Sequence, residues 1–309
     1  MSFDNLFQMR PNLENVSQRP GAMGRVFWVD HFNGNNGNSG TEPGDAFATI
    51  AYAMTQCTAG RFDTIMLFAV WQEAMPIAVN ITTVHIIGVG GSLMCPSATL
   101  NASDDNDIFN LGSAGNNCEI AGISFGGGAT SAGISLGGGA MGTCMGANIH
   151  HNVFGHSFAG DTPLHGIWCE ATATAPQIED NIFLGAGNDV NGTITGDGIF
   201  WPSVSWSIGG IIRNNYLLGC PGIALNMSAR YRGGIIDNNK IALDADTAGA
   251  GITMGANATG NLITNNVAVF GEAAANNPYA DGGAANANHW AGNQGPGGSL
   301  ANTPWLLTA

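Results

Sequence analysis

Two short sequence patterns alternate along the middle of the chain, and this alternation restricts the fold more than any other feature. The first pattern is Ile-x-x-Asn-x-apolar, and it occurs as IHHNVF, IEDNIF, IRNNYL, IDNNKI and ITNNVA, starting at Ile149, Ile178, Ile212, Ile236 and Ile263. The second is Gly-Ile-x-apolar, and it occurs as GISL, GIWC, GIFW, GIAL and GITM, starting at Gly133, Gly166, Gly198, Gly222 and Gly251. Short patterns that recur along a chain in this way indicate a fold of stacked units.

Each period carries two or three short apolar segments separated by glycine-rich turns. Such segments become the strands of a parallel β-helix when each coil stacks on the previous one at about 4.8 Å. A leucine-rich repeat would show a leucine framework with a fixed period, and a β-sandwich would not explain the alternation of two motifs. The sequence therefore predicts an all-β fold, a single-stranded parallel β-helix.

The asparagine of the first pattern is predicted to form a structural ladder. Its amide carries two donors and an acceptor, so copies one coil apart can bond along the axis of the stack. Asparagine also tolerates the bent backbone of a coil corner. A structural role is therefore favoured over a catalytic one for the ladder residues, which are Asn152, Asn181, Asn215, Asn239 and Asn266.

The ends of such a stack must be covered, because an open edge pairs with other chains. The segment RVFWVD is predicted to be a strand, and the helix that follows places Phe47, Ile50, Ala51 and Met54 on one face that could cap the first coil. We predict four regions: an N-terminal arm (1–24), a strand and capping helix (25–60), a parallel β-helix (61–271), and a C-terminal cap or arm (272–309).

Composition excludes several classes of partner. The 309 residues include 22 acidic and 8 basic side chains, a formal net charge of −14, so the basic surface needed for nucleic acid is absent. No apolar run reaches membrane-spanning length, and an acidic membrane surface would repel the chain. The six cysteines form no C-x-x-C pair, which favours buried thiols over a zinc or redox site. Because the first 24 residues lack an apolar signal-peptide core, we expect folding in a reducing cytoplasm.

The N-terminal segment FWVDHFNGNNGNSGTEPGDAFATIAYAM resembles the start of pectate-lyase-like right-handed parallel β-helix proteins. These proteins often begin with a V-D strand, a G-N-D-x-N-S-G-T loop, a proline and an F-x-T-I-x-x-A helix. Matching residues are Val29–Asp30, Asn38–Thr41, Pro43 and Phe47–Ile50. The resemblance covers Arg25 to about Gly271 and implies a right-handed coil. It is less specific for function, because the family includes polysaccharide lyases, hydrolases, phage tailspikes and structural virion proteins.

The residue after the first isoleucine of the ladder pattern is charged or polar in successive coils. Glu179, Arg213 and Asp237 would alternate in sign along one row, and neighbours of opposite charge stabilise a sheet modestly. We favour this surface charge ladder over catalysis. If the chain were an enzyme, it would be a polysaccharide lyase or a glycoside hydrolase, and its candidate catalytic residues would be Glu170, Glu179, Asp180, Asp197 and Arg213.

The second pattern predicts an outward row, since side chains alternate along a strand. This row contains Ser135, Trp168, Phe200, Ala224 and Thr253. Trp168 and Phe200 would lie side by side, and Trp206 would extend the patch. Adjacent exposed aromatic rings indicate a contact surface for a sugar ring or a protein. The alternative is that the loop at 195–197 covers them.

No metal site or cofactor is predicted. The histidine-rich segment HHNVFGHSFAGDTPLH has no zinc-ligand spacing, so its histidines are interpreted as turn residues. The segments DVNGTITGDG and SDDND carry oxygen ligands without the EF-hand pattern. Loose binding of Ca²⁺ by these oxygen-rich segments remains an alternative.

Two functions remain open at this point. The favoured hypothesis is a non-enzymatic phage virion structural protein, a head decoration or cement protein at the virion surface that is assembled in the host cytoplasm. Its partners would be other virion proteins, contacted through the N-terminal arm, and the resemblance implies a homotrimer. The alternative is a tailspike-like protein that binds or degrades carbohydrate.

Overall fold

The computed structural model describes residues 24–68, 73–92, 95–96, 98–101, 106–126, 131–137, 143–156, 163–170, 172–186, 193–202, 206–227, 230–243, 250–270, 278–282 and 287–295. At residues 91–92, 95–96, 206, 243 and 270 only the backbone is described. Within these ranges, helix α2 (Ile50–Gln56) and two short 3₁₀ turns, η2 (Pro43–Asp45) and η3 (Ser113–Gly115), accompany many short strands. No helix in this part of the chain is long and apolar enough to cross a membrane.

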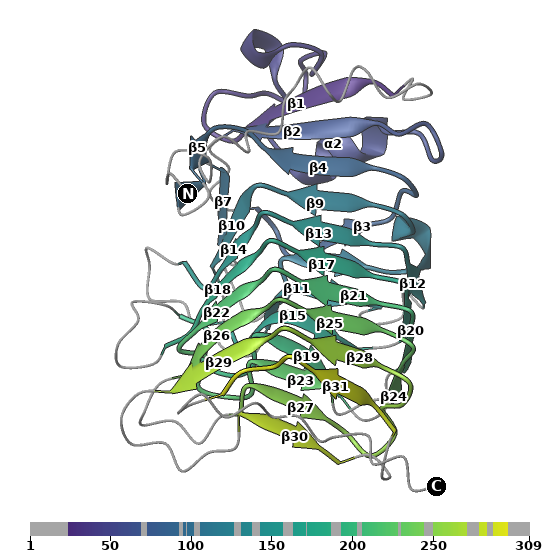
Figure 1. Cartoon of the computed structure of the whole chain (residues 1–309). Coiled ribbons are helices and arrows are strands. Elements are labelled where there is room, and N and C mark those ends of the chain that lie inside the picture. Colours follow the sequence, from purple (N-terminus) through teal and green to yellow (C-terminus); the bar gives the residue numbers. More distant parts are fainter. Residues whose placement is uncertain are drawn as a thin grey trace, which may run out of the picture.

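Among the described residues, the strands form three long parallel sheets that run along the stack (Figure 1). The ten-stranded sheet contains, in order, β1 (Val26–Asp30), β2 (Thr64–Phe68), β4 (His85–Gly88), β9 (Glu119–Ala121), β13 (Asn148–His150), β17 (Gln177–Glu179), β21 (Ile211–Arg213), β25 (Ile235–Asp237), β28 (Leu262–Thr264) and β31 (His289–Ala291). The seven-stranded sheet contains β7 (Ala98–Asn101), β10 (Ile123–Gly126), β14 (Val153–Phe154), β18 (Ile182–Leu184), β22 (Tyr216–Leu218), β26 (Lys240–Leu243) and β29 (Val267–Phe270).

The eight-stranded sheet lies behind these two sheets in Figure 1. It contains β3 (Ile77–Val79), β8 (Phe109–Leu111), β11 (Ala132–Leu136), β15 (His165–Cys169), β19 (Ile199–Trp201), β23 (Leu225–Met227), β27 (Ile252–Met254) and β30 (Tyr279–Asp281). A four-stranded sheet holds β12 (Cys144–Met145), β16 (Ala173–Thr174), β20 (Trp206–Ile208) and β24 (Arg230–Arg232). The short pair β5 (Gly91–Ser92) and β6 (Cys95–Pro96) is antiparallel.

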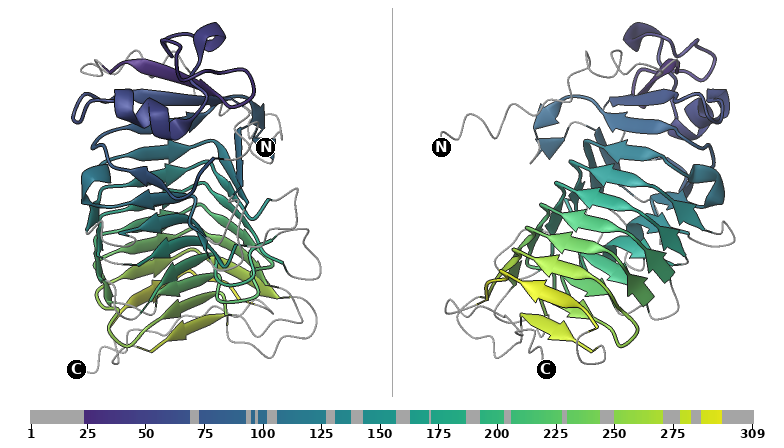
Figure 2. Two further views of the ribbon diagram at one scale, coloured as in Figure 1. Left: turned by 180° about the vertical axis from the view of Figure 1, so that it is seen from behind. Right: turned by 45° about the vertical axis from the view of Figure 1, so that its right-hand side comes forward.

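Successive strands of the chain visit the sheets in a fixed order. Strands β16, β17, β18 and β19 belong in turn to the four-, ten-, seven- and eight-stranded sheets, and the chain then returns to the four-stranded sheet at β20. Each strand therefore pairs with the strand one coil away, as Ile178 does with Ile149 and Ile212. The all-parallel sheets and this stacking, seen from two further sides in Figure 2, are consistent with the predicted parallel β-helix.

Repeated inward residues build the core of the stack. The inward isoleucines of the ten-stranded sheet, including Ile178, are fully buried. On the seven-stranded sheet, Phe154 stacks between Phe125 and Phe183 with ring centroids 4.8 and 4.7 Å apart. These rings explain the glycine of the Gly-Ile pattern, because a Cβ at Gly166 would lie 2.5 Å from the ring of Phe183.

The ladder asparagines lie one coil apart and bond to each other. Each side-chain Nδ2 donates to the Oδ1 of the next asparagine, as Asn152 does to Asn181 at 3.1 Å and Asn181 does to Asn215 at 3.1 Å. The ladder continues through Asn239 and Asn266 and reaches Asn293. All of these side chains are fully buried.

The position of the coil corner differs from the prediction. The residue just before each ladder asparagine, not the asparagine itself, has the positive φ angle of the corner. The residues at these positions are of types that adopt or tolerate this conformation: His151, Asp180, Asn214, Asn238, Asn265 and Gly292. The ladder asparagine then points inward from the next position.

The N-terminal helix also differs in detail. Helix α2 begins at Ile50, with Thr49 accepting a hydrogen bond from the backbone N–H of Tyr52, so Phe47 precedes the helix. Ala51 is exposed and Ala53 is buried in its place, because burial at Ile50, Ala53 and Met54 follows the helical period from that start. The helix packs against β1, β2 and β3.

Candidate functional site

The outward row of the eight-stranded sheet contains the predicted aromatic pair. Register places Ser135, Trp168 and Phe200 side by side on successive coils, and Asn226 and Thr253 follow them. The prediction for Ala224 was therefore wrong. Leu225 pairs with Ile199, so Ala224 occupies the inward place of Gly198, where the side chain must be small, and it is fully buried.

Three rings gather at the centre of this row. The ring of His165 stacks on Phe200 with centroids 4.6 Å apart, and Trp168 lies 6.4 Å from Phe200 and 5.8 Å from His165. The side chains of Trp168 and Phe200 are half-buried, so parts of both rings face solvent. Trp206 lies in β20, but its side chain is outside the described part of the chain.

Asp197 lies beside these rings and ties together neighbouring coils. Its Oδ1 accepts the backbone N–H of Ile223 at 2.5 Å, and its Oδ2 accepts Nδ2 of Asn226 at 2.9 Å. Its own backbone N–H donates to Nδ1 of His165 at 3.2 Å, which requires that nitrogen to be unprotonated. Burial raises the pKa of Asp197 and lowers the pKa of His165 to about 4.

Asp107 has the corresponding role in an earlier coil. Its Oδ1 accepts the backbone N–H of Ala132 at 2.8 Å, and Ala132 pairs with His165 in the next coil. Burial raises the pKa of Asp107, and the negative charge of Glu170 raises it further. In the outward row beside it, Asn110 Oδ1 and Trp168 Nε1 are buried and find no hydrogen-bond partner among the described residues.

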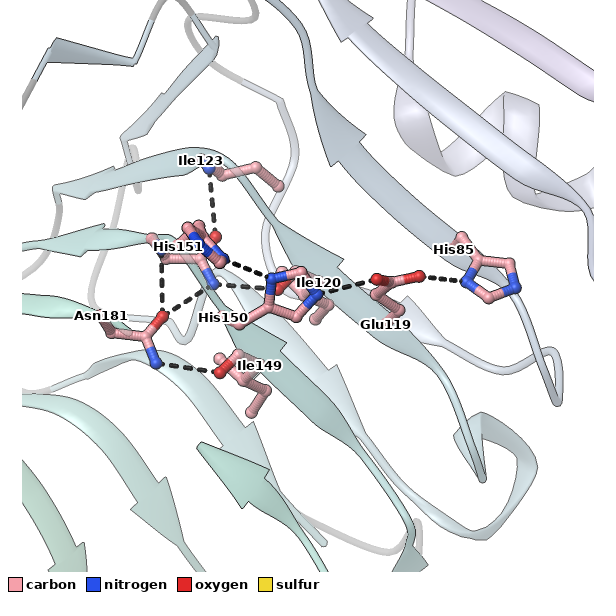
Figure 3. Close-up of polar contacts among 9 residues, drawn as sticks. His85, Glu119, Ile120, Ile123, Ile149, His150, His151 and Asn181 are labelled. Carbon is pink, nitrogen blue, oxygen red and sulfur yellow. Dashed lines mark hydrogen bonds and ion pairs between the residues drawn. The ribbon is translucent and has the colours of Figure 1, made fainter. Parts of the chain in front are cut away.

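A second polar cluster lies on the ten-stranded sheet, where three histidines and a glutamate form a chain of hydrogen bonds (Figure 3). The carboxylate of Glu119 contacts Nδ1 of His85 through Oε2 and Nε2 of His150 through Oε1, the latter at 2.8 Å. Nδ1 of His150 then meets Nδ1 of His151 at 2.8 Å. Burial alone would raise the pKa of Glu119, but the hydrogen bonds from His150 and His85 hold it well below its ordinary value.

The predicted charged row continues along the same sheet in the expected register. His150 pairs with Glu179, Glu179 with Arg213, and Arg213 with Asp237. The guanidinium of Arg213 holds Glu179 through Nη2 and Nε, at 3.0 and 2.9 Å. Asp237 instead accepts hydrogen bonds from Thr264 Oγ1 and Asn265 Nδ2.

The five candidate catalytic residues are divided between two sheets. Glu179, Asp180 and Arg213 lie on the ten-stranded sheet and at its corner, where Asp180 has a φ of 55°. Glu170 directly follows β15 and Asp197 precedes β19, so both flank the eight-stranded sheet. The described structure therefore does not bring the five together, although Asp197 does lie beside the aromatic rings.

Sequence reasoning missed His85 and Glu119, and it considered Asp107 only as part of the oxygen-rich segment SDDND. A signal for the first two was present, because each directly precedes an inward isoleucine in the segments HIIG and EIAG. Within the described residues, no group of three or more His, Cys, Asp or Glu side chains is arranged to hold a metal ion. Asp161, residues 103–105 and residues 189–192 of the segments considered for Ca²⁺ lie outside the described residues.

No protein-family model and no curated protein matches the sequence. Comparison with solved structures finds a rhamnogalacturonan lyase at 13% identity and a TM-score of 0.47, covering 81% of this chain and 69% of that chain. It also finds ORF18 of Geobacillus virus E2 at 12% identity and a TM-score of 0.35, covering 88% of this chain and 62% of that chain. At these identities the similarity is one of backbone arrangement alone.

Proposed function

We propose that the protein is a non-enzymatic structural component of a bacteriophage particle, a decoration or cement protein on the outside of the head. The observation that supports this proposal is the use of its polar groups. Glu179 is held by Arg213, and Asp197 is held by Ile223 and Asn226. A catalytic acid or nucleophile needs an oxygen directed at its substrate, whereas these oxygens are directed at neighbouring coils.

The same proposal extends to the parts of the chain that give the stack its ends and partners. The coil is a single right-handed β-helix, and α2, which packs against β1, β2 and β3, covers its first turn. The arm of residues 1–24 contacts other virion proteins, residues 272–309 form the second cap or arm, and three copies assemble around one axis. A stack whose described coils are joined by buried hydrogen bonds suits a particle exterior.

Antibody labelling of the phage that encodes the protein tests this proposal. We expect gold-labelled antibodies against the full chain to decorate the head uniformly. Particles assembled without the protein should release their DNA at a lower temperature, because a cement protein adds binding energy to the assembled shell. Labelling confined to the tail, or no labelling of intact particles, would contradict the head assignment.

A second candidate function, carbohydrate binding of the tailspike kind, is favoured by the three rings on the eight-stranded sheet. Trp168 and Phe200 each expose part of a ring, and sugar rings stack on such apolar faces. The carboxylate of Asp197 is already bonded to Ile223 and Asn226, so the two partly exposed rings themselves would make the contact with a sugar.

Titration of host surface polysaccharide fragments into the full chain tests this candidate. Replacing Trp168 with alanine should weaken binding at least about fivefold, since one aromatic contact contributes about 1 kcal/mol or more. The matched control is Tyr216→Ala, which removes an exposed aromatic ring from the seven-stranded sheet. Equal binding by both variants and the unmodified protein would exclude this site, and release of reducing sugar would show degradation as well as binding.

A further inference from the structure

Among the described corners of the stack between the ten- and seven-stranded sheets, one carries an imidazole ring and the others do not. The positive-φ corner between the ten- and seven-stranded sheets is formed by Asn214, Asn238 and Asn265 in three later coils, and by His151 in this one. The preceding residue, His150, points outward in the row of Glu179 and Arg213. Two imidazoles therefore meet at this corner, and Figure 3 shows their facing nitrogens.

The geometry allows one proton between the two facing ring nitrogens of this cluster. Nε2 of His150 faces a carboxylate oxygen of Glu119 and so carries a proton, while Nδ1 of His150 faces Nδ1 of His151 at 2.8 Å. Only one proton fits between two nitrogens at that distance. When both rings are neutral, His151 donates; when one ring is charged, the charged ring donates and the neutral ring accepts. If both rings become charged, two N–H groups point at each other.

We propose that His150 and His151 form an acid-sensitive latch that holds this corner closed when at most one of the two rings is charged and opens it when both are. We call the pair the corner latch. The first added proton is stabilised by Glu119, which already accepts a hydrogen bond from His150. The second proton brings a positive charge against another at close range, and separation of the two rings relieves the repulsion.

The charges around the latch come from every neighbouring strand. Glu119 lies on β9 and is shared with His85 of β4, so its negative charge is divided between two histidines. Glu179 on β17 is held by Arg213 of β21. Asp180 at the next corner also favours a charged His151, but burial and the charge of His150 together outweigh these acids and lower the pKa of His151.

Opening of the latch would loosen the start of the asparagine ladder. The residue after His151 is Asn152, whose backbone N–H donates to Asn181 Oδ1 at 3.0 Å. The Oδ1 of Asn152 accepts the backbone N–H of Ile123 at 3.1 Å. Movement of the His151 backbone therefore strains the hydrogen bonds that join three coils, while the later corners, which carry asparagine, are unaffected.

Hydrogen exchange of the full chain at about pH 7.5 and about pH 5 tests the latch. After correction for the intrinsic effect of pH, exchange in residues 148–154 should rise about tenfold at the lower pH. Residues 211–217, which form the corresponding corner with Arg213 and Asn214, serve as the internal control and should show no rise. His151→Asn, which copies the later corners, and His150→Gln should each abolish the rise.

Two results would overturn the proposal. One is an unchanged rate for residues 148–154 at both pH values, and the other is an equal rise in the two variants and the unmodified protein. If the variants misfold, a nuclear magnetic resonance titration of the histidine rings in the unmodified protein tests the corner latch instead. The pKa of His151 should then lie below its ordinary value, and its titration should shift the ring signals of His150, whereas no effect on His150 would contradict the latch.

Discussion

Replacing Asn215 with alanine is expected to lower the free energy of unfolding by about 3–5 kcal/mol, because several buried groups lose their partners at once. The Nδ2 of Asn215 donates to the carbonyl of Ile178 at 2.9 Å and to Asn239 Oδ1 at 3.0 Å. Its Oδ1 accepts the backbone N–H and the Nδ2 of Asn181, at 3.0 and 3.1 Å. The alanine side chain replaces none of these contacts, and the site admits no solvent.

Denaturant unfolding followed by circular dichroism measures this effect, and the neighbouring asparagine is a matched control. Asn214 has a φ of 58° and accepts one exposed hydrogen bond, from Asn238. Glycine adopts this backbone conformation readily, so Asn214→Gly should change the free energy of unfolding by less than about 1 kcal/mol. A cost for Asn215→Ala no larger than that of the control would show that the ladder does not stabilise the stack.

The ladder was predictable because stacking gives each coil the same surroundings at the same position. Identical surroundings select identical residues, and the repeat of asparagine and inward isoleucine made the parallel sheets foreseeable. The assignment of the corner failed on the Asn-Asn pairs, where two neighbouring asparagines have different roles. The first of the pair varies to His151 and Asp180 in other coils, and both types tolerate a positive φ. That variation in the first residue of the pair could have shown that it, and not the ladder asparagine, forms the corner.

Register on the eight-stranded sheet was harder to predict, because the turns differ in length from coil to coil. The letters GIAL at Gly222 match the Gly-Ile pattern, yet the residues that pair with Ile199 and Phe200 are Leu225 and Asn226. In this coil alanine takes the place of the small inward glycine. Matching the letters of the Gly-Ile pattern therefore aligned Gly222 with Gly198, where the structure places Ala224. The error moved the outward position from Asn226 to Ala224.

The polar clusters were the least predictable part of the molecule. Glu119 and His150 are 31 residues apart, and their contact depends on the exact stacking of coils whose corner patterns differ. The same holds for Asp197 and Asn226, which are 29 residues apart. Periodicity identifies which residues face outward, but it does not show which long side chains will reach each other across coils.

Acidification is expected to produce the second large effect, through His165. In the unfolded chain an imidazole has a pKa of 6.5, whereas burial lowers the pKa of His165 to about 4 in the folded protein. Between these values the unfolded chain binds a proton that the folded protein excludes. The free energy of unfolding therefore falls as the pH is lowered from about 6.5 to about 4, by about 3 kcal/mol from this residue.

Comparison of the unmodified protein with His165→Gln isolates this contribution from those of the carboxylates. Glutamine does not titrate, and its side-chain oxygen can accept the backbone N–H of Asp197 that now bonds to Nδ1 of His165. At neutral pH the variant should be somewhat less stable, because it loses the stacking of His165 on Phe200. Towards pH 4 the difference should move by about 3 kcal/mol in favour of the variant. A difference that stays constant across this range would mean that the ring of His165 binds its proton as readily in the folded protein as in the unfolded chain.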